Sequence, residues 1–425
     1  MGMATARAGG EAGTTVARPW LTRWLEANSE LARLYADNPQ LDAVVEEIDG
    51  RKIRIGDRWL IDFASCNYLG LDLDREVIEA IPAYLDRWGT HPSWSRMLGS
   101  PALYEQLEAE VTELTGAEDV LMLQTLTHIH GSAIPVMAGD GTIFVDRRAH
   151  KTIWDGCVVA RAHGATVKRF RHDDPEDLER LLRLESGGFP RLICMDGINS
   201  MTGNPPRLAE FGELARNYEA LLYVDDGHGF GVVGERRSDE LSPYGARGNG
   251  VIRHLGESYD HVILTAGFSK AYSSMLAFVA CQPEVKRLLK VAAPTYLYSG
   301  PVPTASLATV LAGLDVNAAR GDAIRADLYR KTRRVLDHLR ALGVATPNRT
   351  GFPLVLVPLA DPEDLDRVGH ALLDRGIYPT LAPYPGVPRS EVGFRIQVTA
   401  ANTDEEIDSL LLTLDHVRGA LRQSI

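Results

Sequence analysis

A lysine that directly follows a run of apolar residues is the side chain best suited to covalent chemistry in this chain of 425 residues. Lys270 comes after the run 261–265, and the residues on both sides of it are small or apolar, which argues against a solvated position. Such a lysine can form a Schiff base with an aldehyde. The neighbouring Ser269 adds a hydroxyl that suits a phosphate clamp. The pattern predicts a covalently held, phosphorylated aldehyde at Lys270.

A second apolar run, Leu221–Val224, ends in Asp225-Asp226-Gly227-His228. A carboxylate at this place can keep the ring nitrogen of pyridoxal 5′-phosphate (PLP) protonated, and the charged ring then withdraws electrons from a bound substrate. His228 can reach the phenolic oxygen of the same ring. Because Asp and Gly also favour caps and turns, this segment alone leaves both interpretations open.

Two more residues are candidates for the same site. His150 follows the run Thr142–Val145, and its ring could lie flat on the cofactor, although a lone histidine is more often a satisfied core residue. Arg395 interrupts a strand-like apolar run. Buried arginine is rare unless it is paired. Its partner would be either a substrate carboxylate, held in bidentate fashion, or the acid of a structural salt bridge.

These residues need elements that bring them together. From about residue 50, short apolar runs alternate with amphipathic stretches, which predicts an α/β fold with a mainly parallel sheet. In such sheets the site lies at the carboxyl ends of the strands, where these side chains stand. The expected strands are Trp59–Phe63, Val120–Leu123, Thr142–Val145, Val167–Phe170, Leu192–Met195, Leu221–Val224 and Val262–Thr265. The expected helices include Ala102–Thr115, Pro175–Leu184 and Leu208–Tyr218.

The pattern changes after about Pro303 and predicts a smaller α+β domain. Two long helices, roughly Thr304–Ala318 and Gly321–Leu342, precede a strand at 353–357, a helix at 362–374, a strand at 394–399 and a helix at 404–421. The predicted organisation is a disordered tail (1–18), an N-terminal segment (19–60), a large PLP-binding domain (61–302) and a small C-terminal domain (303–425).

The composition narrows the classes of function. A net charge of −12 argues against nucleic acid as the main partner. The four cysteines lie far apart and suit a reducing cytoplasm without metal or disulfides. No run approaches the ~20 apolar residues of a membrane span, and the N-terminus lacks the apolar core of a signal peptide.

One motif points to another class of enzyme. Gly229-Phe230-Gly231-Val232-Val233-Gly234 matches the dinucleotide fingerprint G-x-G-x-x-G. That fingerprint needs its glycine turn at the strand end and a helix opening at once. Here Asp225, Asp226 and His228 intervene and no apolar stripe follows, so a nicotinamide site is not expected.

Taken together, these segments resemble the α-oxoamine synthases, a family of PLP-dependent enzymes with the aspartate-aminotransferase-like fold (fold type I). The likeness runs from about residue 45 to 420, and the stretch from His150 to Leu182 is most similar to the family's serine palmitoyltransferases. It rests on Asn67-Tyr68-Leu69-Gly70-Leu71, Ala149-His150, Trp154-Asp155-Gly156-Cys157, Arg169-Phe170-Arg171-His172, Asp225-Asp226-Gly227-His228, Ser269-Lys270, Tyr298-Ser299, Arg395 and Thr399-Ala400-Ala401.

The resemblance implies a role for each matching residue. Lys270 would be the Schiff-base lysine, His150 the ring-stacking residue, Asp225 the partner of the pyridinium and His228 the partner of the phenolate. Asn67 and Arg395 would bind the carboxylate of the amino acid. Other residues near the cofactor would be Thr125, Leu126, Ser200, Ser269 and, toward the phosphate of a neighbouring subunit in a homodimer with shared sites, Ser299.

Three segments depart from the family pattern. Thr125-Leu126-Thr127-His128-Ile129-His130 stands where the family usually has Ser-Gly-Tyr/Phe-Ala-Ala-Asn, so the wall of the cofactor site differs. Gly267 replaces a threonine and removes one phosphate hydroxyl. Pro92-Ser93-Trp94-Ser95-Arg96 replaces a Gly-rich segment that helps to shape the acyl-donor site.

The resemblance implies that Lys270 removes the Cα proton of an amino acid. The deprotonated amino acid would then attack an acyl thioester of CoA or of an acyl-carrier protein, and loss of CO2 would give an α-amino ketone. Two alternatives stay open. The altered segments 92–96 and 125–130 allow another PLP reaction, such as that of an aldolase, an aminotransferase or a non-decarboxylating condensation. The second alternative is a non-catalytic subunit derived from such an enzyme. The presence of Lys270, Asp225 and His228 together argues against it.

Overall fold

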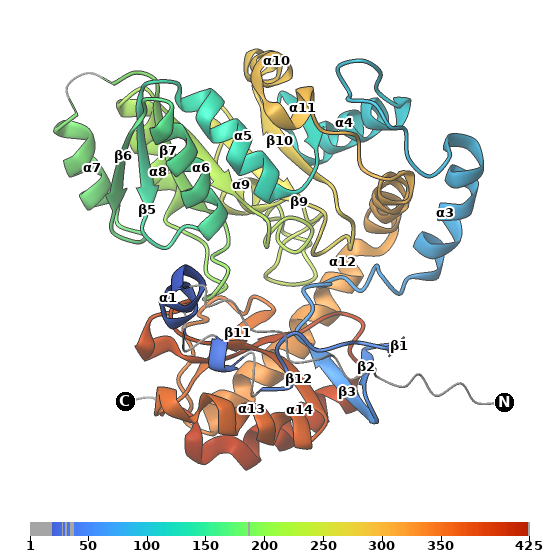
Figure 1. The fold of residues 1–425 in the computed structure, drawn as a ribbon. Helices are drawn as coiled ribbons and strands as arrows, with labels where there is room; N and C mark the ends of the chain where they lie inside the picture. The colour runs from blue at the N-terminus through green and yellow to red at the C-terminus, as the bar shows by residue number, and fades with distance from the viewer. Residues whose placement is uncertain (1–18, 28, 30–31, 35–37, 186–187, 424–425) are drawn as a thin grey trace.

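A seven-stranded sheet forms the centre of the larger part of the computed structural model (Figure 1). Its order is β4-β10-β9-β8-β7-β5-β6, and β10 alone runs antiparallel to its neighbours. The predicted mainly parallel sheet is therefore confirmed. Its strands are β4 (Asp119–Leu123), β5 (Thr142–Asp146), β6 (Thr166–Phe170), β7 (Arg191–Asp196), β8 (Ala220–Asp225), β9 (Val262–Gly267) and β10 (Ala277–Cys281).

The structure describes residues 19–423 except 28, 30–31, 35–37 and 186–187. The predicted tail, 1–18, lies outside the described residues. Within the described part, no helix combines the length and the apolar character that crossing a bilayer requires. The four cysteines are free thiols.

Helices cover both faces of this sheet. Along β8, Leu222 and Val224 pack into one core and Tyr223 into the other, as the two-residue period of a strand requires. The face of Tyr223 is covered by α5 (Leu126–Ala138), α6 (Lys151–Ala162), α10 (Pro283–Ala292) and α11 (Pro294–Leu297). The other face is covered by α4 (Ala102–Thr115), α7 (Pro175–Arg183), α8 (Leu208–Asn217) and α9 (Val251–Leu255).

A second, six-stranded sheet lies below the first in Figure 1 and has the order β1-β2-β3-β12-β13-β11. Only β3 and β12 pair in parallel. The prediction that placed Trp59–Phe63 in the large sheet was wrong, because β3 pairs with β12 from the C-terminal part of the chain; its short apolar run shows a strand but not its partner. The strands are β1 (Glu47–Asp49), β2 (Lys52–Ile55), β3 (Arg58–Phe63), β11 (Leu354–Pro358), β12 (Ile377–Ala382) and β13 (Gly393–Gln397).

A single helix, α12 (Thr304–Ala341), connects the two parts and packs on α3 (Arg75–Trp88) in one and on α14 (Asp404–Val417) in the other. The two separate helices predicted here were wrong. Gly321 lies inside the helix, where a Cβ would come within 2.4 Å of Asn317 Oδ1, so glycine is needed at this position. The glycine therefore marks a close contact and not a helix end.

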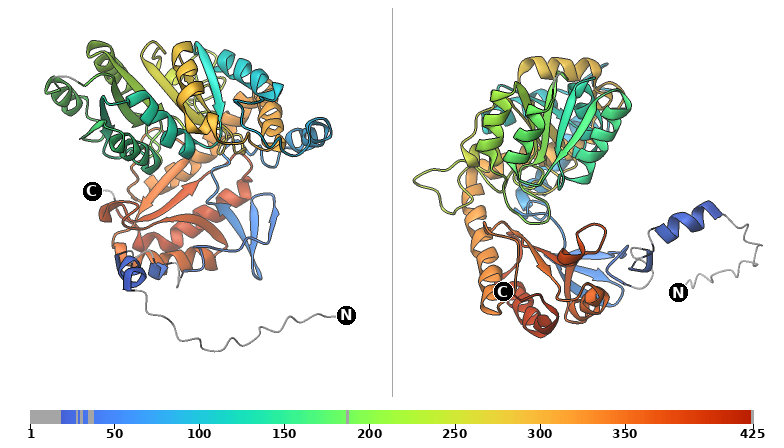
Figure 2. Two further views of the ribbon diagram at one scale, coloured as in Figure 1. Left: turned by 45° about the horizontal axis from the view of Figure 1, so that its top comes forward. Right: turned by 90° about the vertical axis from the view of Figure 1, so that its left-hand side faces the viewer.

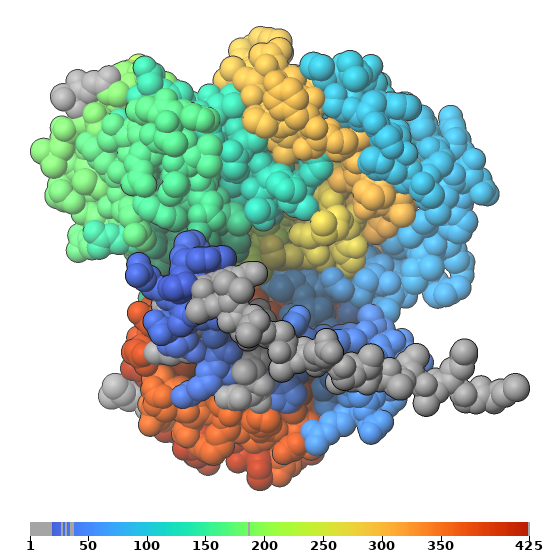
Figure 3. Space-filling model, viewed as in Figure 1, coloured from blue at the N-terminus to red at the C-terminus, as the bar shows by residue number. Residues whose placement is uncertain are grey.

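The remaining elements complete the lower part: α1 (Pro19–Ala27), η1 (Pro362–Asp364), α13 (Leu365–Asp374), η2 (Arg389–Glu391) and η3 (Arg418–Ala420). In the views of Figures 2 and 3 the two parts form two lobes, one above the other. The smaller sheet combines three strands from the N-terminal part of the chain with three from the C-terminal part. The domain boundaries at 60 and 302 remain a proposal. The carboxyl ends of β5, β7, β8 and β9 meet at one edge of the large sheet.

Candidate active site

Lys270 and Asp225 face each other across a glycine. A methyl group on Gly227 would lie 3.1 Å from Lys270 Nζ, 3.1 Å from Asp225 Oδ1 and 2.7 Å from Leu126 Cδ1. The loops after β9 and β8 and the first turn of α5 therefore meet at one point. A Cβ does not fit among these three side chains, so glycine is required at position 227.

Asp225 is held as an ionised carboxylate. It accepts hydrogen bonds from the backbone N–H of Gly227 (2.9 Å) and from His130 Nε2 (3.0 Å). Burial alone would raise the pKa of Asp225, but His130 and then Lys270 outweigh burial and bring the pKa to about 2. A negative charge is thus fixed opposite Lys270.

The adjacent Asp226 has different surroundings. Its carboxylate is fully buried and accepts a hydrogen bond from the backbone N–H of Val251 at 2.7 Å. Burial raises the pKa of Asp226 to about 8. The hydrogen bond with Val251 joins the loop after β8 to α9. Of the two aspartates, Asp225 is the one that lies with Lys270 beside Gly227.

His228 is buried, and its Nδ1 lies 2.8 Å from the hydroxyl of Tyr68. Burial, and then the positive charge of Lys270, lower the pKa of His228 well below its usual range. The imidazole is therefore neutral at physiological pH, with Tyr68 fixing its orientation.

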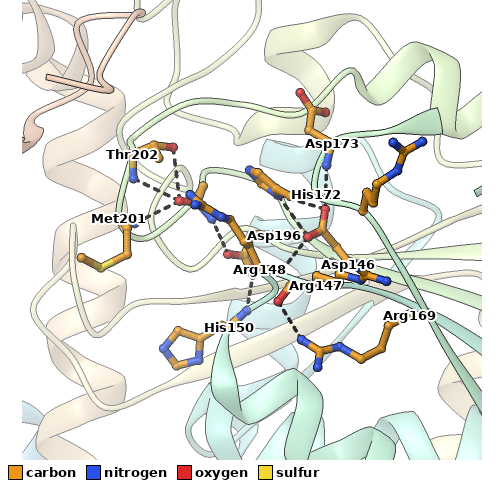
Figure 4. A network of polar contacts seen from close by, with 12 residues as sticks. Asp146, Arg147, Arg148, His150, Arg169, His172, Asp173, Asp196, Met201 and Thr202 are labelled. Carbon is orange, nitrogen blue, oxygen red and sulfur yellow. Dashed lines mark hydrogen bonds and ion pairs between the residues drawn. The ribbon is translucent and has the colours of Figure 1, made fainter. Parts of the chain in front are cut away.

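His150 caps the N-terminus of α6 (Figure 4). Its backbone N–H donates to Asp196 Oδ1 (2.8 Å) at the end of β7, and its Nδ1 lies 2.8 Å from Thr152 Oγ1. Loss of hydration lowers the pKa of His150, against the attraction of Asp225 and together with the repulsion of Lys270. The ring is thus neutral and within the electrostatic reach of both residues.

Arg395, on β13, reaches across to the large sheet. Its Nη1 donates to the backbone oxygen of Ser200 (2.7 Å) and lies 3.7 Å from Met201 Sδ. Its Nε is buried without a hydrogen-bond partner, and no acid pairs with it among the described residues. The alternative that Arg395 forms a structural salt bridge therefore finds no partner among the described residues. The guanidinium keeps donors for a carboxylate.

Asn67 donates from Nδ2 to Asp72 Oδ2 at 2.8 Å, and Arg51 holds the same carboxylate. It precedes Tyr68, which contacts His228. Asn67 thus lies beside the site with its side chain fixed by Asp72.

The first turn of α5 brings together the residues predicted near the phosphate. Thr125 is the residue before the helix, and its Oγ1 lies 3.2 Å from His128 Nδ1. A methyl group on Gly267 would lie 3.1 Å from Leu126 Cδ1 and 3.6 Å from Ser269 Oγ. The free N–H groups of this turn suit a phosphate. Ser299 lies between α11 and α12, and its role toward a neighbouring subunit stays a prediction.

Comparisons with known proteins agree with this arrangement. Residues 58–414 match the family model of class I and II aminotransferases. The chain is 32% identical over 355 residues to a putative 8-amino-7-oxononanoate synthase of Desulforudis audaxviator, covering 83% of this chain and 88% of that protein. It is 31% identical over 358 residues to a serine palmitoyltransferase of Caulobacter vibrioides, covering 84% of this chain and 85% of that protein.

The chain belongs to the α-oxoamine synthase family. The structure also superimposes on Sphingomonas wittichii serine palmitoyltransferase with a TM-score of 0.85 and 25% identity, over 94% of this chain and 98% of that one. This confirms fold type I for the α-oxoamine synthase described here, and its cofactor is PLP.

The residues present fit this cofactor. The Lys270 amine near Gly227 can form a Schiff base with the PLP aldehyde, and the ionised Asp225 suits a protonated ring nitrogen. The described residues contain no group of three or more His, Cys, Asp or Glu side chains that could hold a metal ion.

The sequence analysis did not predict several contacts of this synthase. His130 appeared only as a departure from the family pattern, and Tyr68, Asp196 and Tyr223 were given no role. The signal for His130 is its spacing of four residues from Leu126 on α5, which places both on one face of the helix. The partners are long-range contacts, which no local pattern contains.

The dinucleotide-like glycines have a structural explanation. Gly231 has φ +87°, a Cβ on it would lie 2.6 Å from Ala271 Cβ, and its carbonyl accepts a hydrogen bond from Arg325 of α12. A Cβ on Gly234 would lie 2.0 Å from the carbonyl of Ala246. Close backbone packing therefore accounts for both glycines.

Proposed function

We propose that this enzyme joins an amino acid to an acyl thioester with loss of CO2 and forms an α-amino ketone. The observation that carries the proposal is the convergence of Lys270 Nζ and Asp225 Oδ1 on Gly227, in a chain that is 32% identical to a putative 8-amino-7-oxononanoate synthase. PLP, when bound through Lys270, supplies an electron sink for the Cα–H bond of the amino acid.

The side chains divide the work of this reaction. Arg395 and Asn67 bind the carboxylate of the amino acid, and His150 covers the ring. Asp225 keeps the ring nitrogen protonated, and His228 binds the phenolic oxygen. Lys270, in its neutral form, takes the Cα proton. A bond then forms between Cα and the acyl carbon, the thiol leaves, and CO2 and a returned proton complete the product.

We also propose that a cationic pocket beside His150 receives the phosphorylated end of the thioester carrier. The pocket has a volume of about 800 Å³. Arg169 donates to the backbone oxygen of Arg147 (Figure 4). Its guanidinium also lies 4.9 Å from the Trp154 ring centroid. The pocket is lined by Arg147, Arg148, Lys151 and Arg169, and Glu391 is its one acidic lining residue among those described. Arg148 pairs with Glu391 and Lys151 with Asp155, which leaves Arg147 and Arg169 for a phosphate. CoA and carrier-protein phosphopantetheine both offer phosphate to such a pocket.

The proposed assembly is a cytoplasmic homodimer with shared sites. The family resemblance supports it. Sedimentation of the purified protein should give the mass of two chains.

The test is to incubate the yellow, PLP-loaded enzyme with single amino acids, with and without acyl-CoA, and to measure released thiol and CO2. Stoichiometric release of both is expected, and Lys270→Ala should abolish it together with the absorbance of the lysine-bound cofactor. An oxo acid formed without thiol release would indicate an aminotransferase. A colourless protein that ignores added PLP would contradict the proposal.

The carrier pocket has its own test. Arg169→Ala should raise KM for an acyl-CoA about tenfold and leave KM for the same acyl group on N-acetylcysteamine unchanged, because that thioester has no phosphate. Arg161→Ala, an exposed arginine on the same helix as Lys151, is the matched control. Equal effects on both thioesters would contradict the pocket and not the reaction.

A further inference from the structure

His130 stands where the family usually has asparagine, and it contacts the side chain on which the cofactor chemistry depends. It lies on α5 with no solvent exposure. Its Nε2 is 3.0 Å from Asp225 Oδ2, and its Nδ1 is 2.8 Å from the hydroxyl of Tyr223. One imidazole therefore connects two side chains of β8.

The geometry of the strand explains why one ring can do this. Tyr223 and Asp225 are two residues apart on β8, so their side chains leave the same face of the sheet. Helix α5 packs on that face. An imidazole has nitrogens at two distances from its backbone, so Nδ1 meets the nearer partner and Nε2 the farther one. The amide of asparagine ends at the level of Nδ1 and does not extend to the level of Nε2.

The hydrogen bonds also select one tautomer of His130. Burial raises the pKa of the Tyr223 phenol well above its usual range, so the phenol keeps its proton and donates it to Nδ1. Nδ1 is then an acceptor, and Nε2 carries the proton that it donates to Asp225. Each polar group of this buried chain thereby has a partner.

We propose that His130 is a positioning residue which, with its tautomer fixed by Tyr223, orients Asp225 and keeps it ionised against the ring nitrogen of PLP. Removal of the Cα proton is the step that depends on it. The inference rests on the proposed role of Asp225 and not on the acyl donor. Exchange of the Cα hydrogen of an amino acid with solvent needs no acyl donor, so it can succeed even if the condensation fails.

The first test needs neither cofactor nor substrate. The PLP-free protein, labelled with ¹⁵N-histidine, is measured by NMR at neutral pH, and the His130 signals are identified by their loss in His130→Gln. The expected spectrum has a protonated Nε2 and an unprotonated Nδ1 that accepts a hydrogen bond. A protonated Nδ1 in the wild type would overturn the proposal.

The second test compares substitutions that separate the two contacts. His130→Asn keeps a polar group near Tyr223 and loses the contact with Asp225, whereas His130→Gln extends an amide N–H toward Asp225. The rate of Cα–H exchange should fall about 10–100-fold in His130→Asn, the loss typical when the partner of a functional ligand is removed. His130→Gln should recover most of it, and KM for the amino acid should stay unchanged.

The controls are a surface histidine and a double variant. His163→Asn, on the exposed end of α6, makes the same chemical change away from the site and should exchange at the wild-type rate. In an Asp225→Asn background, adding His130→Asn should cause no further loss, because the two residues act as one unit.

The result that overturns the proposal is exchange within twofold of the wild type in His130→Asn with PLP bound, or an additive loss in the double variant. If His130→Asn does not fold, Tyr223→Phe decides. It removes the donor that fixes the tautomer and should slow exchange several-fold, whereas a wild-type rate in Tyr223→Phe would overturn the proposal.

Discussion

Two aspartates that are neighbours in sequence behave as different chemical groups in this fold. Asp225 is stabilised as an anion by His130 and Lys270, and its pKa falls to about 2. Asp226 faces the opposite side, is surrounded by Gly197, Gly229 and Gly250, and has its pKa raised to about 8 by burial. At this scale the surroundings, and not the residue type, decide which carboxyl group can hold a protonated ring nitrogen.

Asp226 predicts a pH dependence of stability. Its pKa is about 8 in the folded state and ~3.9 when unfolded. The folded state therefore keeps a proton that the unfolded chain has lost, and the free energy of unfolding decreases as pH rises from about 4 to 8. Asp226→Asn cannot titrate and should remove this slope. The difference in Tm between the variant and the wild type, measured on PLP-free protein, should become more positive from pH 5 to pH 8.5.

Asp225→Asn is the comparison for that experiment. The pKa of Asp225 is depressed, so its contribution to stability is complete above the unfolded pKa and is lost only as pH falls toward 2. The difference in Tm between Asp225→Asn and the wild type should therefore be constant above pH 5. A constant difference for Asp226→Asn as well would contradict the assignment of a raised pKa.

Arg395→Leu should weaken binding of the amino acid and leave binding of PLP nearly intact. Its guanidinium contacts the Ser200 backbone oxygen but no acid in the described part of the chain. Loss of a desolvated charged contact typically costs ~2–5 kcal/mol. KM for the amino acid should therefore rise more than thirtyfold, while PLP absorbance persists. A variant that unfolds would show a structural role instead.

At the scale of single elements, the buried Arg325 joins α12 to the loop after β8. It donates to Asn317 Oδ1 (2.7 Å) and the Gly231 carbonyl (3.1 Å), and it pairs with Asp322 at 2.5 Å. The side chain has no solvent exposure. Helix α12 is thereby fixed to the loop that follows Asp225.

Arg325→Ala should lower the free energy of unfolding by about 2–5 kcal/mol, because it leaves buried acceptors without donors. Arg330→Ala, on the same helix, is the matched control. Its ion pairs with Asp327 and Asp404 are exposed and should cost less than ~1 kcal/mol. Chemical denaturation of both variants measures the difference, and equal losses would contradict the role of Arg325.

Some elements could be predicted from sequence and others could not, for physical reasons. Apolar runs that end in polar residues indicated β5, β7, β8 and β9, which carry most of the site. The antiparallel β10 was missed because no residue pattern tells a reversed apolar strand from a buried loop. Gly321 suggested a break because glycine favours helix ends, and the sequence did not show that Asn317, one turn earlier on the same helix, leaves no room for a Cβ. His130 was visible as a substitution, but its hydrogen bonds depend on how α5 packs on β8.

At the scale of the whole molecule, the segment before α4 is one of the three that depart from the family pattern. Arg96 anchors it, since its guanidinium is buried against Glu108 (2.9 Å) and lies 3.9 Å from the Tyr104 ring centroid. Trp94 is half exposed and donates from Nε1 to the Gly99 carbonyl. Its indole lines an apolar cavity of about 340 Å³ together with Leu103 and Leu307.

Trp94 predicts a preference for short or aromatic acyl groups, because a bulky indole in this segment leaves less room for a chain. Each methylene that does not fit costs ~1–3 kcal/mol in discrimination. Palmitoyl-CoA should therefore be a poor donor, and Trp94→Gly should shift the optimum to longer chains in a series of increasing length. If the wild type prefers sixteen carbons and the glycine variant shows no shift, Trp94 points away from the donor.

The parallel pairing of β3 with β12 has a consequence for synthesis on the ribosome. Every strand of the large sheet lies between these two partners in the chain, so the upper lobe can bury its core while β3 is paired only with β2 and its other edge is still open. During that interval the charged Arg58 and Asp62 of β3 protect an open strand edge from pairing with other chains. The nascent polypeptide thus contains Lys270 and Asp225 well before Arg395, and the side chain proposed to bind the carboxylate of the amino acid is added late in synthesis.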